Sequence, residues 1–153
     1  MSPVSASTLQ DLSRPECVDL LATSAVGRIG VTLEGRPVIL PVNFAVVDGS
    51  ILFRTGHGTK LAAATAHVVV AFEADAFDAD GAAGWSVLVR GTCTEVTDPV
   101  DLERMRAVPL EKWVTDGGAD RYVLISLTEI SGRRFDHGTH EGGSLHRARP
   151  RPG

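Results

Sequence analysis

The dipeptide Asp48-Gly49 is the feature that most restricts how this chain can fold. It lies between the apolar-rich runs 36–47 and 51–55, and an Asp-Gly connection of this kind favours a tight turn between antiparallel strands. Upstream, apolar residues alternate with polar or small residues over 25–33, which is the pattern of a half-buried strand. The three segments therefore predict an antiparallel meander.

Further strands and three short helices are expected along the rest of the chain. The strands are 68–73, 85–96 with a bulge at Gly91, and 122–130 with an extension at 133–135; the helices are one capped by Thr8 or Ser13 that ends near Leu21, one over 59–67, and one over 99–107. Residues 74–84 are expected to form an exposed loop. Six short strands with peripheral helices favour a small antiparallel barrel or sandwich, and 153 residues fit one domain.

Pro41 lies inside the predicted strand 36–47, where proline cannot donate a hydrogen bond to a neighbouring strand. Two interpretations remain open. Either the strand bends or bulges at Pro41 and turns backbone groups toward a ligand, or this stretch lies at the edge of the sheet.

Charge is unevenly distributed along the chain, whose net charge is −4. Residues 1–132 carry 10 basic and 17 acidic residues, whereas residues 133–153 carry 5 and 2. Because an acidic body repels phosphate groups, we expect no nucleic-acid partner. The tail is rich in Gly and Pro, so we expect a single domain over 1–135 and a disordered basic tail over 136–153.

The chain lacks an apolar run of the roughly 20 residues that cross a bilayer, and its first ten residues do not resemble a secretory signal. We therefore expect a cytoplasmic protein without a membrane partner. Cys17 and Cys93 are far apart in sequence, and free buried thiols are expected for both.

The stretch R-T-G-H-G-T-K at 54–60 is the strongest indication of chemistry. Gly56 and Gly58 allow backbone N–H groups to approach an anion closely. Arg54 can hold two phosphate oxygens, and Lys60 adds a point charge at the start of a predicted helix. The stretch predicts a phosphate-binding loop, with a solvated turn between strand and helix as the alternative.

Two other segments suit a heteroaromatic ring with polar edges, because they combine flat apolar surface with polar side chains. They are Pro41-Val42-Asn43 and Trp85-Ser86-Val87. For Trp85, a role in core packing is the alternative.

Four motifs together resemble the pyridoxamine 5′-phosphate oxidase-like family of flavin-binding split barrels. They are G-R-I-G-V-T at 27–32, P-V-I-L-P-V-N-F at 37–44, D-G-S-I-L-F-R-T-G-H-G-T-K-L at 48–61 and W-S-V-L-V-R-G-T at 85–92. The resemblance covers residues 12–135 and is greatest to the small actinobacterial and nitroimidazole-reductase-like members. It implies a mainly β protein with a six-stranded antiparallel split barrel, which forms a homodimer and binds FMN between its subunits.

The resemblance also implies which residues contact the flavin. Arg54, Thr55 and Lys60 correspond to phosphate ligands, Pro41, Val42 and Asn43 to the lining of the isoalloxazine ring, and Trp85 and Ser86 to further contacts from the same or the partner subunit. The implied activity is that of an oxidoreductase that transfers a hydride or electrons to a small substrate. A deazaflavin-dependent reductase and a non-catalytic flavin- or haem-binding module are the alternatives.

The sequence offers no catalytic acid or base, and no substrate-phosphate motif that would predict vitamin B6 oxidation. His137, His140 and His146 with Glu141 form an H-x-x-H-E pattern, but metal ligands need a rigid frame that this segment lacks, so no metal is expected. Arg28 and Arg90 are expected to form structural ion pairs with acids such as Glu73 or Glu95.

Overall fold

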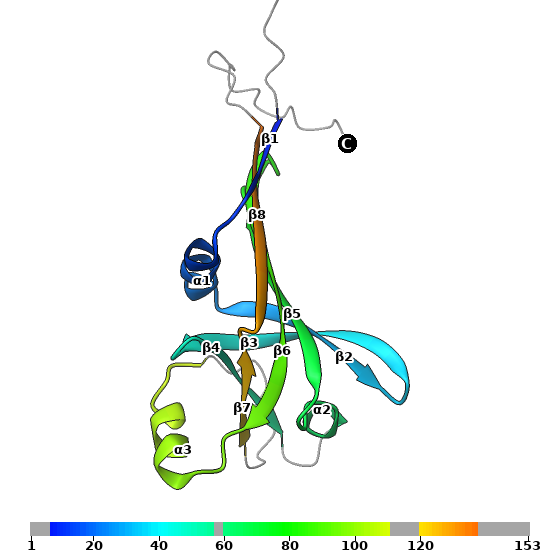
Figure 1. The fold of residues 1–153 in the computed structure, drawn as a ribbon, viewed down its shortest axis with the longest axis vertical. Coiled ribbons are helices and arrows are strands. Elements are labelled where there is room, and N and C mark those ends of the chain that lie inside the picture. Colours follow the sequence, from blue (N-terminus) through cyan, green and yellow to red (C-terminus); the bar gives the residue numbers. More distant parts are fainter. Residues whose placement is uncertain (1–6, 57–59, 111–119, 138–153) are drawn as a thin grey trace, which may run out of the picture.

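The computed structural model describes residues 7–56, 60–110 and 120–137, and Figure 1 shows their arrangement. The elements are β1 (Ser7–Asp11), α1 (Arg14–Ala22), β2 (Val26–Leu33), β3 (Arg36–Val47), β4 (Ser50–Gly56), α2 (Lys60–Ala64), β5 (Val69–Phe77), β6 (Ala83–Glu95), α3 (Pro99–Arg106), β7 (Asp120–Ser126) and β8 (Glu129–His137). Apart from the end of β8, the predicted tail and its histidine motif lie outside the described residues.

Six of the eight strands close a barrel. Each strand pairs antiparallel with the next in the order β2, β3, β4, β7, β6, β5, and β5 returns to β2. The predicted six-stranded antiparallel barrel is therefore confirmed. Of the two remaining strands, β8 lies beside the outer half of β6 and β1 lies beside β8, and both extend away from the barrel, as the upper part of Figure 1 shows.

Strand β6 belongs to both the barrel and this extension. Its residues 83–90 pair with β8, and its residues 93–95 pair with β7. Gly91 lies between the two segments, where a Cβ atom would be only 1.7 Å from the carbonyl oxygen of Ser126. The predicted bulge is wrong, because the register with β5 runs through Gly91 without a break. Residue 91 must be glycine because the backbone of Ser126 passes too close to leave room for a Cβ atom.

Helix α1 begins where its capping residues place it. The Ser13 hydroxyl accepts a hydrogen bond from the Glu16 N–H, and the Ser13 N–H donates to the Glu16 carboxylate. Of the two predicted caps, Ser13 is therefore confirmed and Thr8 is wrong. Thr8 lies instead in β1, which the sequence analysis did not predict.

Two other predicted boundaries differ from the structure. Strand β5 continues to Phe77 and β6 begins at Ala83, so the expected loop over 74–84 shrinks to 78–82. The expected strand 122–130 divides into β7 and β8, because the chain turns at Leu127, which is buried. The Arg14 guanidinium holds this turn by donating to the Leu127 carbonyl oxygen at 2.6 Å.

The apolar core has two parts. The barrel interior is filled by aliphatic side chains around Phe44 and Phe72, whose ring centroids lie 4.8 Å apart in an edge-to-face contact. A second cluster outside the barrel lies between β4, β7 and α3. It is formed by Leu52, Val96, Met105 and Tyr122.

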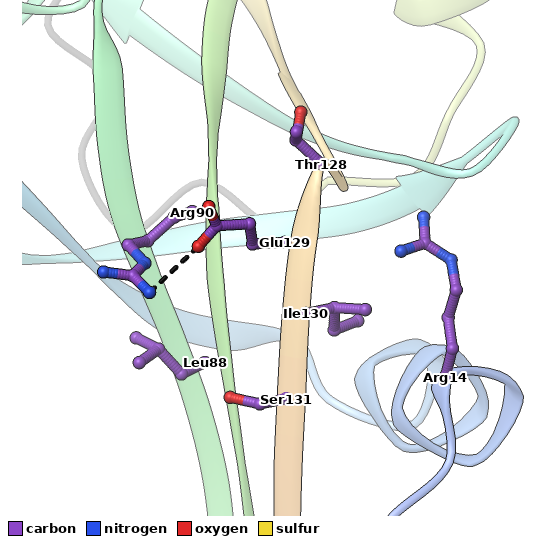
Figure 2. Close-up of a pocket in the computed structure, with 7 residues that line it drawn as sticks. All are labelled: Arg14, Leu88, Arg90, Thr128, Glu129, Ile130 and Ser131. Carbon is purple, nitrogen blue, oxygen red and sulfur yellow. Dashed lines mark ion pairs between the residues drawn. The ribbon is translucent and has the colours of Figure 1, made fainter.

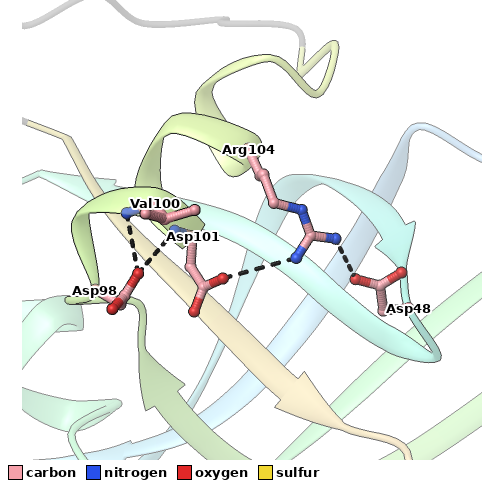
Figure 3. Close-up of polar contacts among 5 residues, drawn as sticks. All are labelled: Asp48, Asp98, Val100, Asp101 and Arg104. Carbon is pink, nitrogen blue, oxygen red and sulfur yellow. Dashed lines mark hydrogen bonds and ion pairs between the residues drawn. The ribbon is translucent and has the colours of Figure 1, made fainter.

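Helix α3 covers this second cluster, and polar contacts hold its start (Figure 3). Asp98 caps it by accepting hydrogen bonds from the N–H groups of Val100 and Asp101 at 2.9 and 3.1 Å. Arg104 then reaches the β3–β4 turn and pairs with Asp48 at 2.8 Å. The closed end of this hairpin is thus covered and its charge paired.

Both cysteines are free and buried, as predicted. Burial raises the pKa of the Cys93 thiol to about 12, so this thiol is inert at neutral pH. Over the described ranges, the helices are too short or too polar to cross a membrane.

Candidate functional site

The predicted ring-lining residues divide between two faces of β3. Successive side chains of a strand point to opposite faces. Val42 packs against the barrel core, whereas Pro41 is exposed on the outer face and Asn43 lies on that face half-buried. Of the three, Pro41 and Asn43 are therefore brought together and Val42 is not.

Pro41 occupies an edge position. It lies opposite Arg28 of β2, and the ladder between β3 and β4 begins only at Phe44. A proline is tolerated where one side of the strand has no neighbour. The edge interpretation is confirmed and the bulge is wrong, because β2 and β3 keep one register from residue 36 to residue 43.

Asn43 and Arg54 lie at the open end of the β3–β4 hairpin. The last pair of that ladder is Phe44 opposite Phe53, so Asn43 and Arg54 are the next residues outward, on the same face. The Asn43 Oδ1 atom is shielded from solvent and has no hydrogen-bond partner among the described residues. This is a notable cost, because an unmatched buried carbonyl loses its water without compensation.

The Arg54 side chain is held in place from two sides. Its Nη2 atom donates to the Leu110 carbonyl oxygen at 2.9 Å, and its guanidinium carbon lies 6.0 Å from the centroid of the Tyr122 ring. A fixed positive charge therefore lies on the same face and at the same end of the hairpin as the shielded Asn43 oxygen.

Thr55 points to the opposite face of β4 from Arg54, into the end of the barrel. It is 4% exposed, and its hydroxyl has no hydrogen-bond partner among the described residues. It borders a cavity of about 40 Å³ that Arg121 also lines. The lining residues are Thr55, Ala62, Thr65, Ala66, His67, Glu95, Arg121 and Val123. Two of the predicted phosphate ligands thus lie on different faces.

Trp85 and Ser86 are likewise on opposite faces of β6. Ser86 lies on the outer face, opposite Asp75 of β5 and Arg133 of β8. Trp85 is half-buried against the core, in accordance with its packing interpretation, and also borders a groove of about 400 Å³. Residues 57–59 and the side chain of Lys60 lie outside the described part of the chain, so the rest of the phosphate loop stays a prediction.

An ionic cluster on the outer face joins β2 to β5. We call Arg28, Glu73 and Asp75 the Arg28 cluster. Arg28 Nη1 lies 3.3 Å from Glu73 Oε1, which confirms the predicted pair, and 3.2 Å from Asp75 Oδ2. Burial raises the pKa of Glu73 to about 7, with Asp75 adding to the effect and Arg28 opposing it.

The sequence analysis missed Asp75 as a member of this cluster because it ended the strand at Glu73. The signal was present, since A-F-E-A-D-A-F over 71–77 continues the alternation of buried and outward residues. Two acids two positions apart on one strand face the same side. A strand extended to residue 77 would have predicted that Glu73 and Asp75 lie side by side on the outer face.

A larger groove of about 450 Å³ lies along β8, and its lining includes none of the predicted site residues (Figure 2). Arg90 pairs there with Glu129 at 2.9 Å, an acid that the sequence analysis did not name. Glu95 lies instead 3.6 Å from Arg121. The predicted role of Arg90 in a structural ion pair is therefore confirmed, with Glu129 as its partner.

The outer face thus offers an amide oxygen, a fixed cation and an acid with a raised pKa, a set that suits a planar ligand with polar edges and negative charge. Within the described ranges, groups of three or more His, Cys, Asp or Glu side chains arranged to hold a metal do not occur.

Comparison with known proteins gives a consistent result. The family described as pyridoxamine 5′-phosphate oxidase matches residues 13–134. The uncharacterized protein Rv0080 of Mycobacterium tuberculosis is 40% identical over 139 residues, which is 88% of this chain and 90% of that protein.

Two solved structures have similar folds. The FAD binding protein from Mycobacterium smegmatis is 40% identical, with a TM-score of 0.71 over 82% of this chain and 97% of that one. A Corynebacterium glutamicum protein, provisionally named a pyridoxamine 5′-phosphate oxidase, is 30% identical, with a TM-score of 0.73 over 86% and 96%.

Proposed function

The chain belongs to the pyridoxamine 5′-phosphate oxidase family, and from this membership we propose that it binds a flavin nucleotide on the outer barrel face around Asn43 and Arg54. The observation that carries the proposal is the shielded Asn43 Oδ1 atom, which has no partner among the described residues at a position that the family motif predicts. The 40% identity to an FAD binding protein supports the same class of ligand.

The residues present fit a flavin in their chemistry. A flavin ring carries an imide N–H that can donate to an amide oxygen such as Asn43 Oδ1, and its phosphate suits a guanidinium such as Arg54. The unmatched Thr55 hydroxyl points into the end of the barrel rather than to the outer face, so its predicted contact with the phosphate stays a prediction. Polar groups that cost stability when unmatched are expected where a ligand completes them.

A bound flavin would supply hydride or electron transfer, and the chain's own residues would orient and stabilise it. Asn43 fixes one polar edge, Arg54 balances negative charge, and Pro41 offers a flat apolar surface that excludes water. The substrate would be a small molecule. The proposed site of action is the cytoplasm.

We propose FMN first, because the motif at 54–60 suits a terminal phosphate, and FAD as the direct alternative. A deazaflavin-dependent reductase and a non-catalytic flavin or haem carrier are the remaining alternatives. Reduction of the bound cofactor by NAD(P)H, followed by reoxidation with a small acceptor, separates an enzyme from a carrier.

We propose that a second copy of this chain covers part of the outer face. Ile39 and Val69 are 72% and 71% exposed there, and Leu88 is 43% exposed. Large apolar side chains grouped on one face are typical of an interface between subunits. Light scattering that gives the mass of a monomer at micromolar concentration would contradict this part of the proposal.

The first test is the absorption spectrum of the purified full chain, followed by mass identification of any released chromophore. Released FMN or FAD supports the proposal, and a Soret band would favour haem. A colourless protein that binds neither added FMN nor added FAD contradicts it.

The double variant Arg54→Ala/Lys60→Ala tests the site. We expect affinity for the flavin to fall at least about 100-fold, because two charge-assisted contacts are lost. Stability should fall by about 1 kcal/mol, since Arg54 also bonds the Leu110 carbonyl. Arg104→Ala removes an exposed arginine at the closed end of the same hairpin and should leave flavin affinity unchanged.

A further inference from the structure

The Arg28 cluster lies in the middle of the face that carries the proposed cofactor site. Arg28 is opposite Pro41 of β3, and Asp75 is opposite Ser86 of β6, so predicted flavin contacts lie on both sides of the cluster. Three strand spacings, about 14 Å, separate β3 from β6. A ligand that touches both Pro41 and Ser86 of one chain must therefore cover the cluster.

The cluster has more acid than base. Arg28 Nη1 is shared between the Glu73 and Asp75 carboxyl groups at 3.3 and 3.2 Å, so one cation faces two acids. With both acids ionised, the cluster carries one excess negative charge; with one proton bound, it is neutral. Burial raises the pKa of Glu73 to about 7, and the hydrogen bond to Asp75 favours the protonated form further.

The neighbouring strands do little to neutralise this charge. On β6, the residues opposite Glu73 and Asp75 are Leu88 and Ser86, and on β3 the residue beyond Arg28 is Pro41. Two further cations face this side. Arg133 of β8 is opposite Ser86, one strand farther away, and Arg90 of β6 is paired with Glu129.

We propose that the Arg28 cluster takes up one proton from solvent when an anionic flavin nucleotide covers it, so that cofactor binding on this face is coupled to pH. This inference rests on the proposed function. A ligand over the cluster removes water from the carboxylates and adds like charge through its phosphate. Both effects disfavour the ionised form, so the complex binds the proton more tightly than the free protein does.

Calorimetry tests the proposal directly. FMN and FAD are titrated into the apo full chain at pH 7.5 in two buffers of different ionisation enthalpy, and the difference in observed enthalpy gives the protons taken up. We expect uptake of about half to one proton, and affinity that falls about tenfold from pH 6 to pH 8. In the Glu73→Gln variant, both the proton uptake and the pH dependence of the affinity should be lost.

Glu129→Gln is the matched control. Glu129 lies on the same face, pairs with a single arginine, and is 64% exposed. Removing its charge should therefore leave the number of protons taken up equal to that of the wild type. Flavin binding without proton uptake, or with equal uptake in Glu73→Gln, overturns the inference and leaves the proposed function standing. A wild-type chain that binds neither flavin at any pH overturns the proposed function.

A second measurement needs no cofactor. Carbon-13 NMR of the Glu73 carboxyl in the free protein should show a titration midpoint near 7, and Asp75→Asn should lower that midpoint because a like charge is removed. A midpoint near the ordinary value of 4.5 overturns the inference whether or not flavin binds.

Discussion

The two ends of the β3–β4 hairpin differ in how their polar groups are matched. At the closed end, Asp48 pairs with Arg104 and the second apolar cluster lies beneath α3. At the open end, the shielded Asn43 oxygen and the buried Thr55 hydroxyl have no partner among the described residues. The polar groups of the closed end are matched, whereas the open end keeps polar groups that are unmatched within the described part of the chain.

The strongest test of the closed end is Leu52→Ala. Leu52 is fully buried in the second cluster, so we expect the free energy of unfolding to fall by about 3 kcal/mol, measured by urea denaturation. Leu9→Ala, at a 64% exposed position in β1, is the control and should change little. A loss below about 1 kcal/mol for Leu52→Ala would mean that α3 adds little to this end.

A smaller loss is expected for Asp98→Ala, which removes the cap of α3. Two backbone N–H groups would lose their acceptor, at a cost of about 1 to 2 kcal/mol. Thermal unfolding followed by circular dichroism measures it. Asp80→Ala, in the exposed 78–82 loop, should be neutral. Equal effects of the two variants would contradict the capping role.

Two buried threonines that line the same cavity compare a matched hydroxyl with an unmatched one. The Thr65 hydroxyl donates to the Leu61 carbonyl oxygen at 2.8 Å, so Thr65→Val should cost about 1 kcal/mol. The Thr55 hydroxyl has no partner among the described residues, so Thr55→Val should leave stability unchanged within about 0.5 kcal/mol. A cost of Thr55→Val equal to that of Thr65→Val would remove the contrast.

The smallest effect is a pH dependence from Glu73. Its pKa is about 7 in the folded protein against an ordinary 4.5, so the folded state holds the proton more tightly. Stability from this group is complete below pH 4.5 and is lost as the pH rises through 7. Because the side chain is 36% exposed, the loss should be only about 0.5 kcal/mol.

Glu73→Gln should remove this component, which urea denaturation at pH 5 and pH 8 would measure. Glu129→Gln, in an exposed ion pair, should keep the wild-type difference. A pH dependence that is the same in both variants would show that another group is responsible.

Local signals predicted much of the fold. The Asp48-Gly49 turn, the Ser13 cap and the helix that starts at residue 99 depend on residues close in sequence, and each is found as expected. Strand β1 was missed because its partner is remote: Ser7 lies opposite His137, and nothing near residue 7 indicates that pairing.

The orientation of the predicted site residues could not be read from the sequence, and their contact with a ligand stays a prediction. The motifs located the open end of the hairpin at Asn43 and Arg54, yet they did not indicate that Thr55 and Trp85 point to the other face. The division of 122–130 at Leu127 was also missed, because alternation alone does not show where a chain turns.

The closure of the barrel through β7 has a consequence for synthesis. Both β4 and β6 pair with β7, so the barrel stays open until residues 120–126 have left the ribosome. Strand β1 is synthesised first, but its partner β8 is synthesised last, so β1 stays unpaired even longer. Through most of translation, the nascent chain therefore exposes unpaired strand edges that favour aggregation. Its need for chaperones should be greatest just before the last strands emerge.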